Sequence, residues 1–210
     1  MQHDELKKKL NIIKTDYSGK VFKGIIESIK REKINDDRML EDIEELSRKR
    51  FNERVRYTMN VPVGNLLEGV ATIVVLIMVF MINSDWMLYI SALALMTTLH
   101  PLAHYSTGAF FGIKFTHYYL NGPAKIEPTL RIDHISYLKA SGKKRALMHL
   151  SGVIGTVAAP LVAALVAVQK GAHDVAFNLF VMFLLLILFE LLTSMKIGDL
   201  MKAKREYGYR

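Results

Sequence analysis

Hydrophobic residues follow two different patterns along this chain of 210 residues. Up to about residue 60 they recur at helical spacing between many charged residues, and beyond it they gather in long runs between short charged clusters. A helix needs roughly 20 apolar residues to cross a bilayer. Four runs suit this role, namely Leu66–Ile82, Trp86–Ile113, Ala146–Val168 and Val175–Met195. The pattern predicts an all-α polytopic membrane protein with four transmembrane helices and an N-terminal cytoplasmic helical extension.

The first 60 residues carry three apolar stripes at intervals of three or four, which is the spacing of one face of a helix. They are Leu6/Leu10/Ile13, Ile25/Ile26/Ile29 and Met39/Leu40/Ile43/Leu46. The run Tyr17–Gly19 predicts a break after the first helix, and Asn35–Asp37 predicts a cap for the last one. This region is interpreted either as a solvated cytoplasmic extension or as a docking module for a partner.

Composition divides the chain into an amphipathic helical region at 1–60, a membrane domain at 61–202 and a basic tail at 203–210. Pro62 and Gly64 are predicted to form the hinge into the membrane. The first long apolar run begins near residue 66, too deep for a secretory signal peptide, and we expect no cleavage.

Basic residues concentrate in three places. The first 60 residues hold 15 Lys and Arg against 12 Asp and Glu, the segment 114–145 holds seven against two, and the tail is basic. The other two connections are almost uncharged, so the positive-inside rule places both termini in the cytoplasm. The net charge of +8 fits this topology and attraction to anionic lipid. We therefore expect the lipid bilayer, and not nucleic acid, as the partner of these charges.

The second apolar run carries two histidines four residues apart, His100 and His104, in the sequence His-Pro-Leu-Ala-His. That spacing places both imidazoles on one face of a helix, as in the zinc-binding HExxH motif, with Pro101 at the position of the glutamate. The chain has no cysteine, so any metal must be held by His, carboxylate, backbone or water. The pair is interpreted either as metal ligands or as a hydrogen-bonded structural pair.

Three further ionisable residues are candidates for completing a site. Asp199 follows the last apolar run, Glu190 lies inside it, and His149 lies at the start of the third run. Each also has a structural interpretation: Asp199 as a solvated charge at a helix end, Glu190 as an interhelical hydrogen-bonding group and His149 as a pairing partner.

Proline and small residues predict how the second and third runs are shaped. Pro101 removes a backbone hydrogen bond to the carbonyl of Thr97, and we expect Thr97 and Thr98 to satisfy the freed groups. Gly108 and Gly112 are predicted to allow close helix packing. The third run carries small residues at a strict spacing of four, namely Ser151, Gly155, Ala159, Ala163 and Ala167.

Three features, in this order, resemble the site-2 protease family of intramembrane zinc metalloproteases. The first is the run His100–Tyr105 on a span that descends to the cytoplasm. The second is the small-residue stretch Leu150–Gly155, and the third is the aspartate in Gly198–Asp199. The resemblance covers roughly residues 66–202 and leaves the first 60 residues aside.

The resemblance implies that His100, His104 and Asp199 bind zinc. In that family a glutamate after the first histidine activates the attacking water, and here Pro101 takes its place. Leu200 also follows Asp199 where the family has glycine. The chain is therefore interpreted as a degenerate, proteolytically inactive member that keeps the fold and the metal and binds membrane-spanning segments of other proteins.

Two alternatives stay open. One is an active, atypical zinc metalloprotease with Glu190 as the base. It requires a break around Thr193–Ser194, because nine residues of continuous helix would separate Glu190 from Asp199 by about 13 Å. The other is a metal-free membrane scaffold that recruits a cytoplasmic partner. Haem binding ranks last, because one pair on one helix does not place ligands on opposite faces of an iron.

Overall fold

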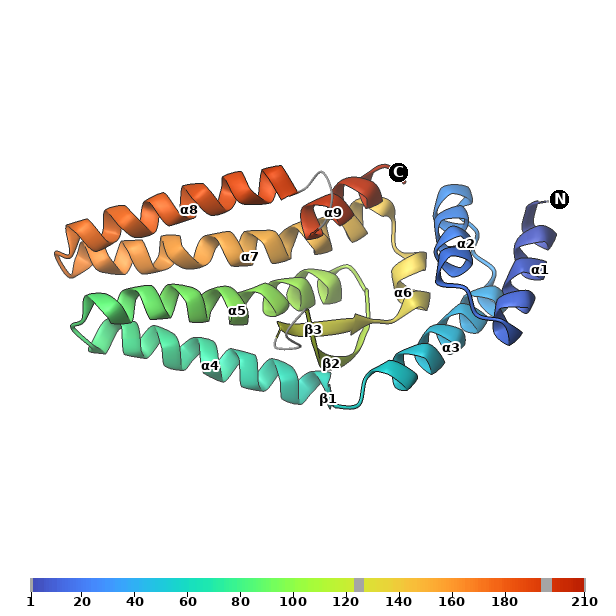
Figure 1. Ribbon diagram of the computed structural model, residues 1–210, viewed down its shortest axis with the longest axis horizontal. Coiled ribbons are helices and arrows are strands. Elements are labelled where there is room, and N and C mark those ends of the chain that lie inside the picture. Colours follow the sequence, from blue (N-terminus) through green and yellow to red (C-terminus); the bar gives the residue numbers. More distant parts are fainter. Residues whose placement is uncertain (1, 123–126, 194–197, 210) are drawn as a thin grey trace.

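The computed structural model describes residues 2–122, 127–193 and 198–209. The described residues are mostly helical, as the hydrophobic pattern predicts, and the molecule is elongated (Figure 1). Three helices form the N-terminal end and four long helices form the opposite end. A small sheet and two further helices lie between these two groups (Figure 1).

The N-terminal extension consists of α1 (Gln2–Thr15), α2 (Gly19–Glu32) and α3 (Asp37–Arg54). The three predicted stripes face one another and form a single buried hydrophobic cluster, with Ile26 at its edge. Ser18 caps α2 and Asp36 caps α3, where the Asp36 carboxylate accepts a hydrogen bond from the amide of Met39 at 3.1 Å. Both predicted helix boundaries are confirmed.

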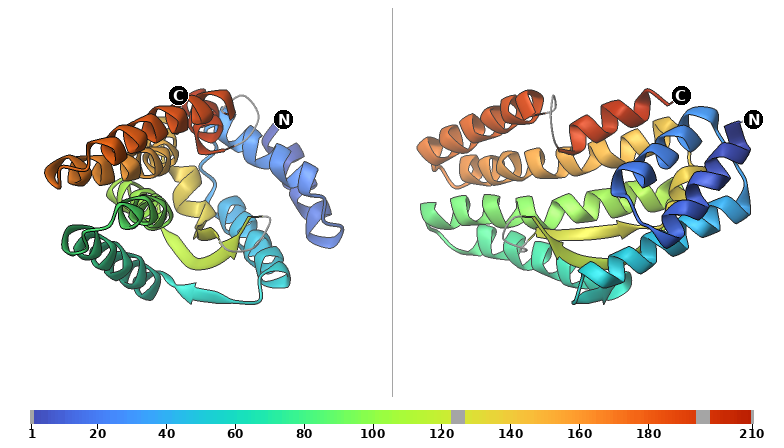
Figure 2. Two further views of the ribbon diagram at one scale, coloured as in Figure 1. Left: turned by 60° about the vertical axis from the view of Figure 1, so that its left-hand side comes forward. Right: turned by 45° about the vertical axis from the view of Figure 1, so that its right-hand side comes forward.

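The extension packs against the middle of the molecule through α6 (His134–Lys139), as both views in Figure 2 show. Ile135 and Leu138 of α6 join the hydrophobic cluster of the extension. Beside them, the Glu44 carboxylate accepts hydrogen bonds from Arg131 Nη2 at 2.7 Å and from the amide of His134 at 2.9 Å. The extension is therefore attached by apolar and by ionic contacts.

Within the described residues, four helices are long and apolar enough to cross a membrane. They are α4 (Val61–Met81), α5 (Asp85–Phe110), α7 (Gly142–Gln169) and α8 (His173–Thr193). Each begins one to five residues before the predicted run. The predicted end of the last run at Met195 lies outside the described residues. The central helices α5 and α7 have 26 and 28 residues, and the flanking helices α4 and α8 have 21 each (Figure 1).

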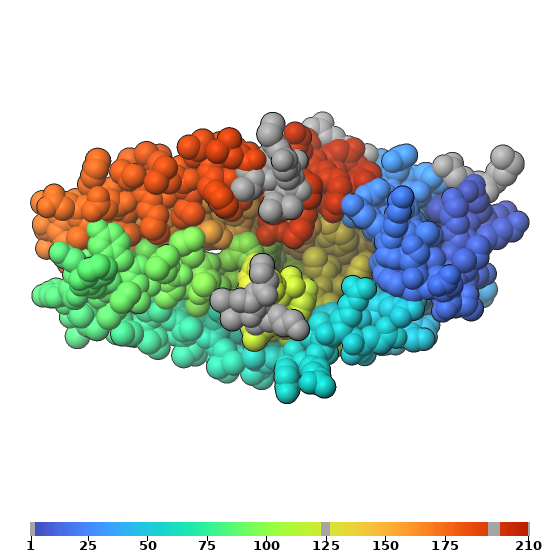
Figure 3. Space-filling view, in the orientation of Figure 1, coloured from blue at the N-terminus to red at the C-terminus, as the bar shows by residue number. Residues whose placement is uncertain are grey.

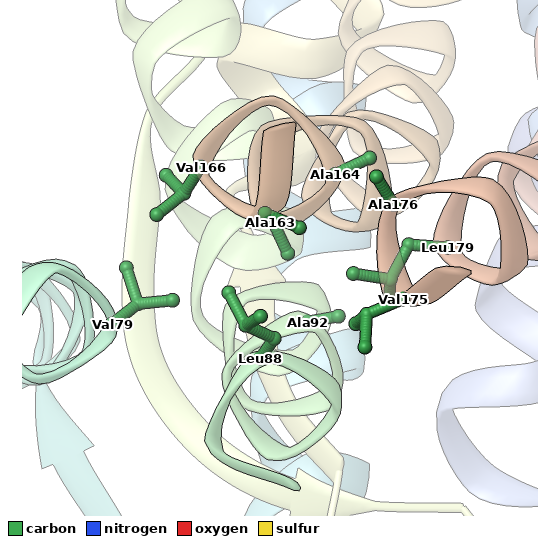
Figure 4. Packing of buried hydrophobic residues seen from close by; sticks show 10 residues of the cluster. Val79, Leu88, Ala92, Ala163, Ala164, Val166, Val175, Ala176 and Leu179 are labelled. Carbon is green, nitrogen blue, oxygen red and sulfur yellow. The ribbon is translucent and has the colours of Figure 1, made fainter. Parts of the chain in front are cut away.

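The small-residue stripe of α7 packs against α5, as predicted. Ala163 is fully buried and faces α5 at the end of the four helices where Leu88 and Ala92 lie (Figure 4). Farther along, a Cβ added to Gly155 would lie 2.8 Å from the carbonyl oxygen of Leu99. Only a very small residue therefore permits this approach of the two backbones.

Two predictions about glycine and proline are wrong. Gly112 lies past the end of α5 with a φ of +78°, and a Cβ added to it would meet no atom of the described residues within 4 Å, so it ends the helix and does not mark a close helix contact. Pro62 and Gly64 form no hinge, because both lie in the first turn of α4, where proline needs no hydrogen-bond partner. The ring of Tyr118 occupies the space beside Gly64, which therefore serves helix–sheet packing.

The segment 114–145, expected to be a loop, contains regular structure that the sequence pattern did not predict. It holds β2 (Phe115–Asn121), β3 (Glu127–Ile132) and α6. β2 pairs antiparallel with β3 on one side and with β1 (Thr58–Asn60) on the other, giving the order β1-β2-β3. The sheet lies under the end of α5 that carries the histidines (Figure 1).

Candidate metal centre

The two histidines of α5 are oriented by polar atoms of α7. His100 Nδ1 lies 3.1 Å from the carbonyl oxygen of Gly152 and 2.9 Å from Thr156 Oγ1. His104 Nδ1 lies 2.7 Å from the carbonyl oxygen of Met148. Because a carbonyl oxygen only accepts hydrogen bonds, Nδ1 of each ring carries the proton, and in the neutral ring Nε2 keeps its lone pair.

The backbone of α7 comes very close to these rings. A Cβ added to Gly152 would overlap the imidazole of His104. The two imidazoles themselves lie edge to face, with ring centroids 4.6 Å apart. Gly152 belongs to the small-residue stretch of the resemblance, and here it provides the space that His104 fills.

Asp199 completes the group from a third helix. It is the first residue of α9 (Asp199–Tyr207), which lies against α7 and follows Gly198, whose φ is +97°. Asp199 Oδ2 lies 3.1 Å from His104 Nε2 and 3.3 Å from His100 Nε2. Burial alone would raise the pKa of Asp199, but its contacts with His100, His104 and His149 hold it far below the usual range. The carboxylate is therefore ionised.

These three side chains could hold a metal ion. Their ligand atoms, two Nε2 and one carboxylate oxygen, all lie within 4.8 Å of one another. Zinc bound tetrahedrally at 2.0–2.1 Å places neighbouring ligand atoms about 3.3 Å apart, close to the distances from Asp199 Oδ2. The hydrogen bonds from Nδ1 to carbonyl oxygens are the usual support of metal-ligating histidines.

His149 lies beside the group without joining it. Its Nδ1 is 3.6 Å from Asp199 Oδ1 and has no hydrogen-bond partner among the described residues, although the side chain is buried. Its Nε2 lies 3.0 Å from the hydroxyl of Tyr137. His149 was predicted as a further ligand or a pairing partner, and it lies farther from Asp199 than His100 and His104 do.

The prediction for the threonines beside Pro101 is wrong. Thr97 Oγ1 donates to the carbonyl of Ala94 at 2.7 Å, one turn away from the carbonyl that Pro101 leaves free. Thr98 Oγ1 pairs with Thr72 Oγ1 of α4 at 2.8 Å. Because Thr98 is buried and α4 lies beside it, the hydroxyl pair joins two helices and does not repair the backbone of α5.

Glu190 lies on α8, within range of electrostatic interaction with Asp199 and His100. The described part of α8 ends at Thr193 and α9 begins at Asp199, so the two carboxylates do not share one helix. The predicted break at Thr193–Ser194 extends outside the described residues. The separation of about 13 Å along a continuous helix therefore does not apply to this pair.

A cavity of about 120 Å³ opens beside the three ligand residues. Pro101 and the β3 residues from Glu127 to Leu130 also line it. No local pattern in the sequence indicated this second carboxylate, because the sheet brings Glu127 to the site. Lys202 was not predicted as a site residue either, although its spacing of three from Asp199 indicates a contact between the two side chains if they share a helix. Its Nζ lies 2.8 Å from Asp199 Oδ1, which leaves Oδ2 to face the histidines.

Comparisons with protein-family models, with curated proteins and with solved structures yield no match to this chain. The proposed function is therefore based on the geometry of the site and on the sequence motifs.

Proposed function

We propose that the protein is an intramembrane zinc-binding protein, similar to site-2 proteases, that binds membrane-spanning segments of other proteins without cleaving them. The convergence of His100 Nε2, His104 Nε2 and Asp199 Oδ2 is the single observation on which this proposal rests. A zinc ion held by these atoms would supply a Lewis acid. The chain's own contribution is to hold the three ligands in place from α5, α7 and α9.

The absence of proteolysis is proposed because of Pro101. A proline side chain accepts no proton, and Pro101 lies in the cavity wall next to His100, where the family carries its glutamate. General-base catalysis requires a proton acceptor within hydrogen-bond reach of the reacting group. With no acceptor at that position, we expect the protein to retain binding and to lose hydrolysis.

The surroundings of the cavity suit an extended peptide. β3 pairs with β2 on one edge, and the described residues supply no strand for its other edge. Residues of β3 line the cavity together with His100 and His104. An extended segment that enters the cavity gains backbone hydrogen bonds by adding to a free strand edge. This supports a peptide segment, unwound from its membrane helix, as the bound partner.

Metal analysis by mass spectrometry on detergent-purified protein tests the zinc proposal. We expect about one zinc per chain in the wild type and none in the variant His100→Ala/His104→Ala. The matched control is His173→Ala, since His173 is exposed at the start of α8, away from the site. The absence of any stoichiometric divalent metal in the wild type would leave a metal-free scaffold as the better function.

An active metalloprotease is the second candidate, favoured by the position of Glu190. α8 and α9 are separate helices, and Glu190 lies within range of electrostatic interaction with Asp199 and His100. Incubation with a fluorescent single-span reporter peptide tests this candidate. Cleavage by the wild type that is lost in Glu190→Gln would support it, and cleavage lost only in Glu127→Gln would assign the base to β3. Binding without cleavage supports the inactive protein.

A further inference from the structure

The buried face of α9 carries a carboxylate at each end. Asp199, Ala203 and Glu206 are spaced by four and three residues, so they lie on one face of the helix. Ala203 and Glu206 are buried, and Glu206 is completely inaccessible to solvent. The helix therefore contacts the rest of the protein through one carboxylate at the candidate metal centre and a second one about two turns away.

Glu206 is held by cations from two different parts of the chain. Lys30 Nζ of α2 lies 2.5 Å from Glu206 Oε1, and Arg145 Nε of α7 lies 2.6 Å from Glu206 Oε2. Arg145 also donates a hydrogen bond to the carbonyl of Ala140. Both cations are buried, and Lys30 belongs to the N-terminal extension. Figure 3 shows α9, in red, next to the blue surface of the extension.

A second line of contacts connects the same cations with the centre. The ammonium of Lys30 lies 4.8 Å from the centroid of the Tyr137 ring, and the guanidinium of Arg145 lies 5.5 Å from it. The hydroxyl of Tyr137 reaches His149 Nε2 at 3.0 Å, and His149 faces Asp199. Lys30 is thus linked to Asp199 both along α9 and through the side chains beside it.

Burial makes this arrangement sensitive to the loss of either charge. Removing one partner of a buried ion pair leaves the other charge in a poorly solvating environment, and the structure around it must rearrange. α9 packs mainly against α7, which carries Arg145, and the ion pair between Lys30 and Glu206 attaches the helix to the extension. A rearrangement at Glu206 therefore moves the helix that begins with Asp199.

We propose that Glu206 is a positioning residue for Asp199, and that the N-terminal extension holds the ligand in place through Lys30. The extension then acts on the metal centre from a distance, without contributing a ligand. The functional meaning of this inference rests on the proposed metal site. The positioning of α9 itself can be measured without any metal.

Cobalt(II) serves as the spectroscopic probe of the centre, because its visible absorption reports the number and symmetry of its ligands. In Lys30→Met and in Glu206→Gln we expect Co²⁺ affinity to fall by about tenfold or more, the usual cost of losing a residue that supports a ligand, with the absorption band altered toward that of Asp199→Asn. Lys20→Met, at an exposed position of the same helix, should leave both unchanged. Lys30→Arg should restore binding, since a cavity of about 400 Å³ beside Lys30 leaves room for the larger group. If Lys30→Met and Glu206→Gln fold and bind Co²⁺ with the affinity and the absorption spectrum of the wild type, the proposal is overturned.

A distance measurement separates this inference from the metal proposal. The chain has no cysteine, so spin labels can be attached to Lys144→Cys on α7 and Lys204→Cys on α9, both at exposed positions. In metal-free protein we expect a narrow distance distribution that broadens or shifts in Lys30→Met and Glu206→Gln and stays narrow in Lys20→Met. An unchanged distribution would overturn the positioning role, whether or not the wild type binds Co²⁺. Gel filtration and circular dichroism identify any variant that fails to fold. If Lys30→Met fails to fold, the distance distribution of Glu206→Gln, which keeps the shape of the side chain, decides whether Glu206 positions α9.

Discussion

His104 is fixed on several sides by groups that belong to other helices. Its Nδ1 contacts the carbonyl of Met148, its Nε2 faces Asp199, and Gly152 lies against the ring. A side chain held in this way loses little conformational freedom when it binds a ligand. The proposed centre is therefore largely preorganised, and its metal affinity would depend on residues that do not contact the ion.

The variant Gly152→Ala tests this dependence on close packing. The added methyl group would overlap the imidazole of His104, so we expect zinc affinity to fall by about tenfold or more. Gly69→Ala is the matched control, because a Cβ at that position in α4 meets no atom within 4 Å. Zinc titration of both purified variants measures the difference. Equal affinities would mean that α7 does not position His104.

The residues of the site differ in how far the sequence could predict them. The spacing of His100 and His104 and the carboxylate after the last apolar run are local signals, and the structure brings these three residues together. The role of Gly152 depends on a neighbouring helix, and Glu127 reaches the cavity only through the sheet. Contacts between elements that are distant in sequence leave no periodic pattern. Neither the role of Gly152 nor that of Glu127 could therefore be predicted.

Among the elements, the three helices of the extension and the four long helices were predictable, and the sheet and the short helices α6 and α9 were not. An amphipathic helix or a long apolar run repeats its signal over many residues. β1 has only three residues, all exposed, and β2 and β3 lie in a segment dominated by basic residues. Pairing with a partner strand stabilises them, and Tyr118 of β2 packs against Gly64 of α4. The sheet thus depends on tertiary contacts more than on its own pattern.

The attachment of α3 to β3 and α6 should depend on pH. Burial alone would raise the pKa of Glu44, but hydrogen bonds from His134 and Arg131 lower it from 4.5 to about 2. A carboxyl group whose pKa is depressed in the folded state stabilises that state above its unfolded pKa and loses this effect as pH falls toward the folded value. The contribution, on the order of 3 kcal/mol, is therefore complete at pH 6 and lost between about pH 4.5 and 2.

Hydrogen exchange of the amides in α3, measured between pH 6 and pH 3 with correction for intrinsic rates, tests this expectation. Protection should fall with pH in the wild type and much less in Glu44→Gln. The control is Glu53→Gln, because Glu53 is exposed and pairs only with Arg50 of its own helix among the described residues. Equal pH dependence in all three proteins would contradict the role of Glu44.

On the scale of the whole molecule, the predicted orientation remains to be tested. The distribution of Lys and Arg predicts that both termini face the cytoplasm. The chain offers a background without cysteine, so single-cysteine variants can be labelled with a membrane-impermeant maleimide in sealed vesicles of known orientation. We expect Lys20→Cys and Lys204→Cys to react from the cytoplasmic side, and Ser84→Cys and His173→Cys from the opposite side. Reaction of all four from one side would refute a four-span topology.

The lengths of the long helices bear on how an ion would reach the proposed centre. α4, with 21 residues, is about 31 Å long, close to the thickness of the hydrocarbon layer. His104 is the twentieth residue of α5, which places it about 28 Å from the far end of that helix. In a bilayer spanned by these helices, His104 and Asp199 would lie near the boundary between the hydrocarbon layer and the headgroups. Loading and release of an ion would proceed directly from the aqueous phase on the side of the extension, with no permeation pathway through the bilayer.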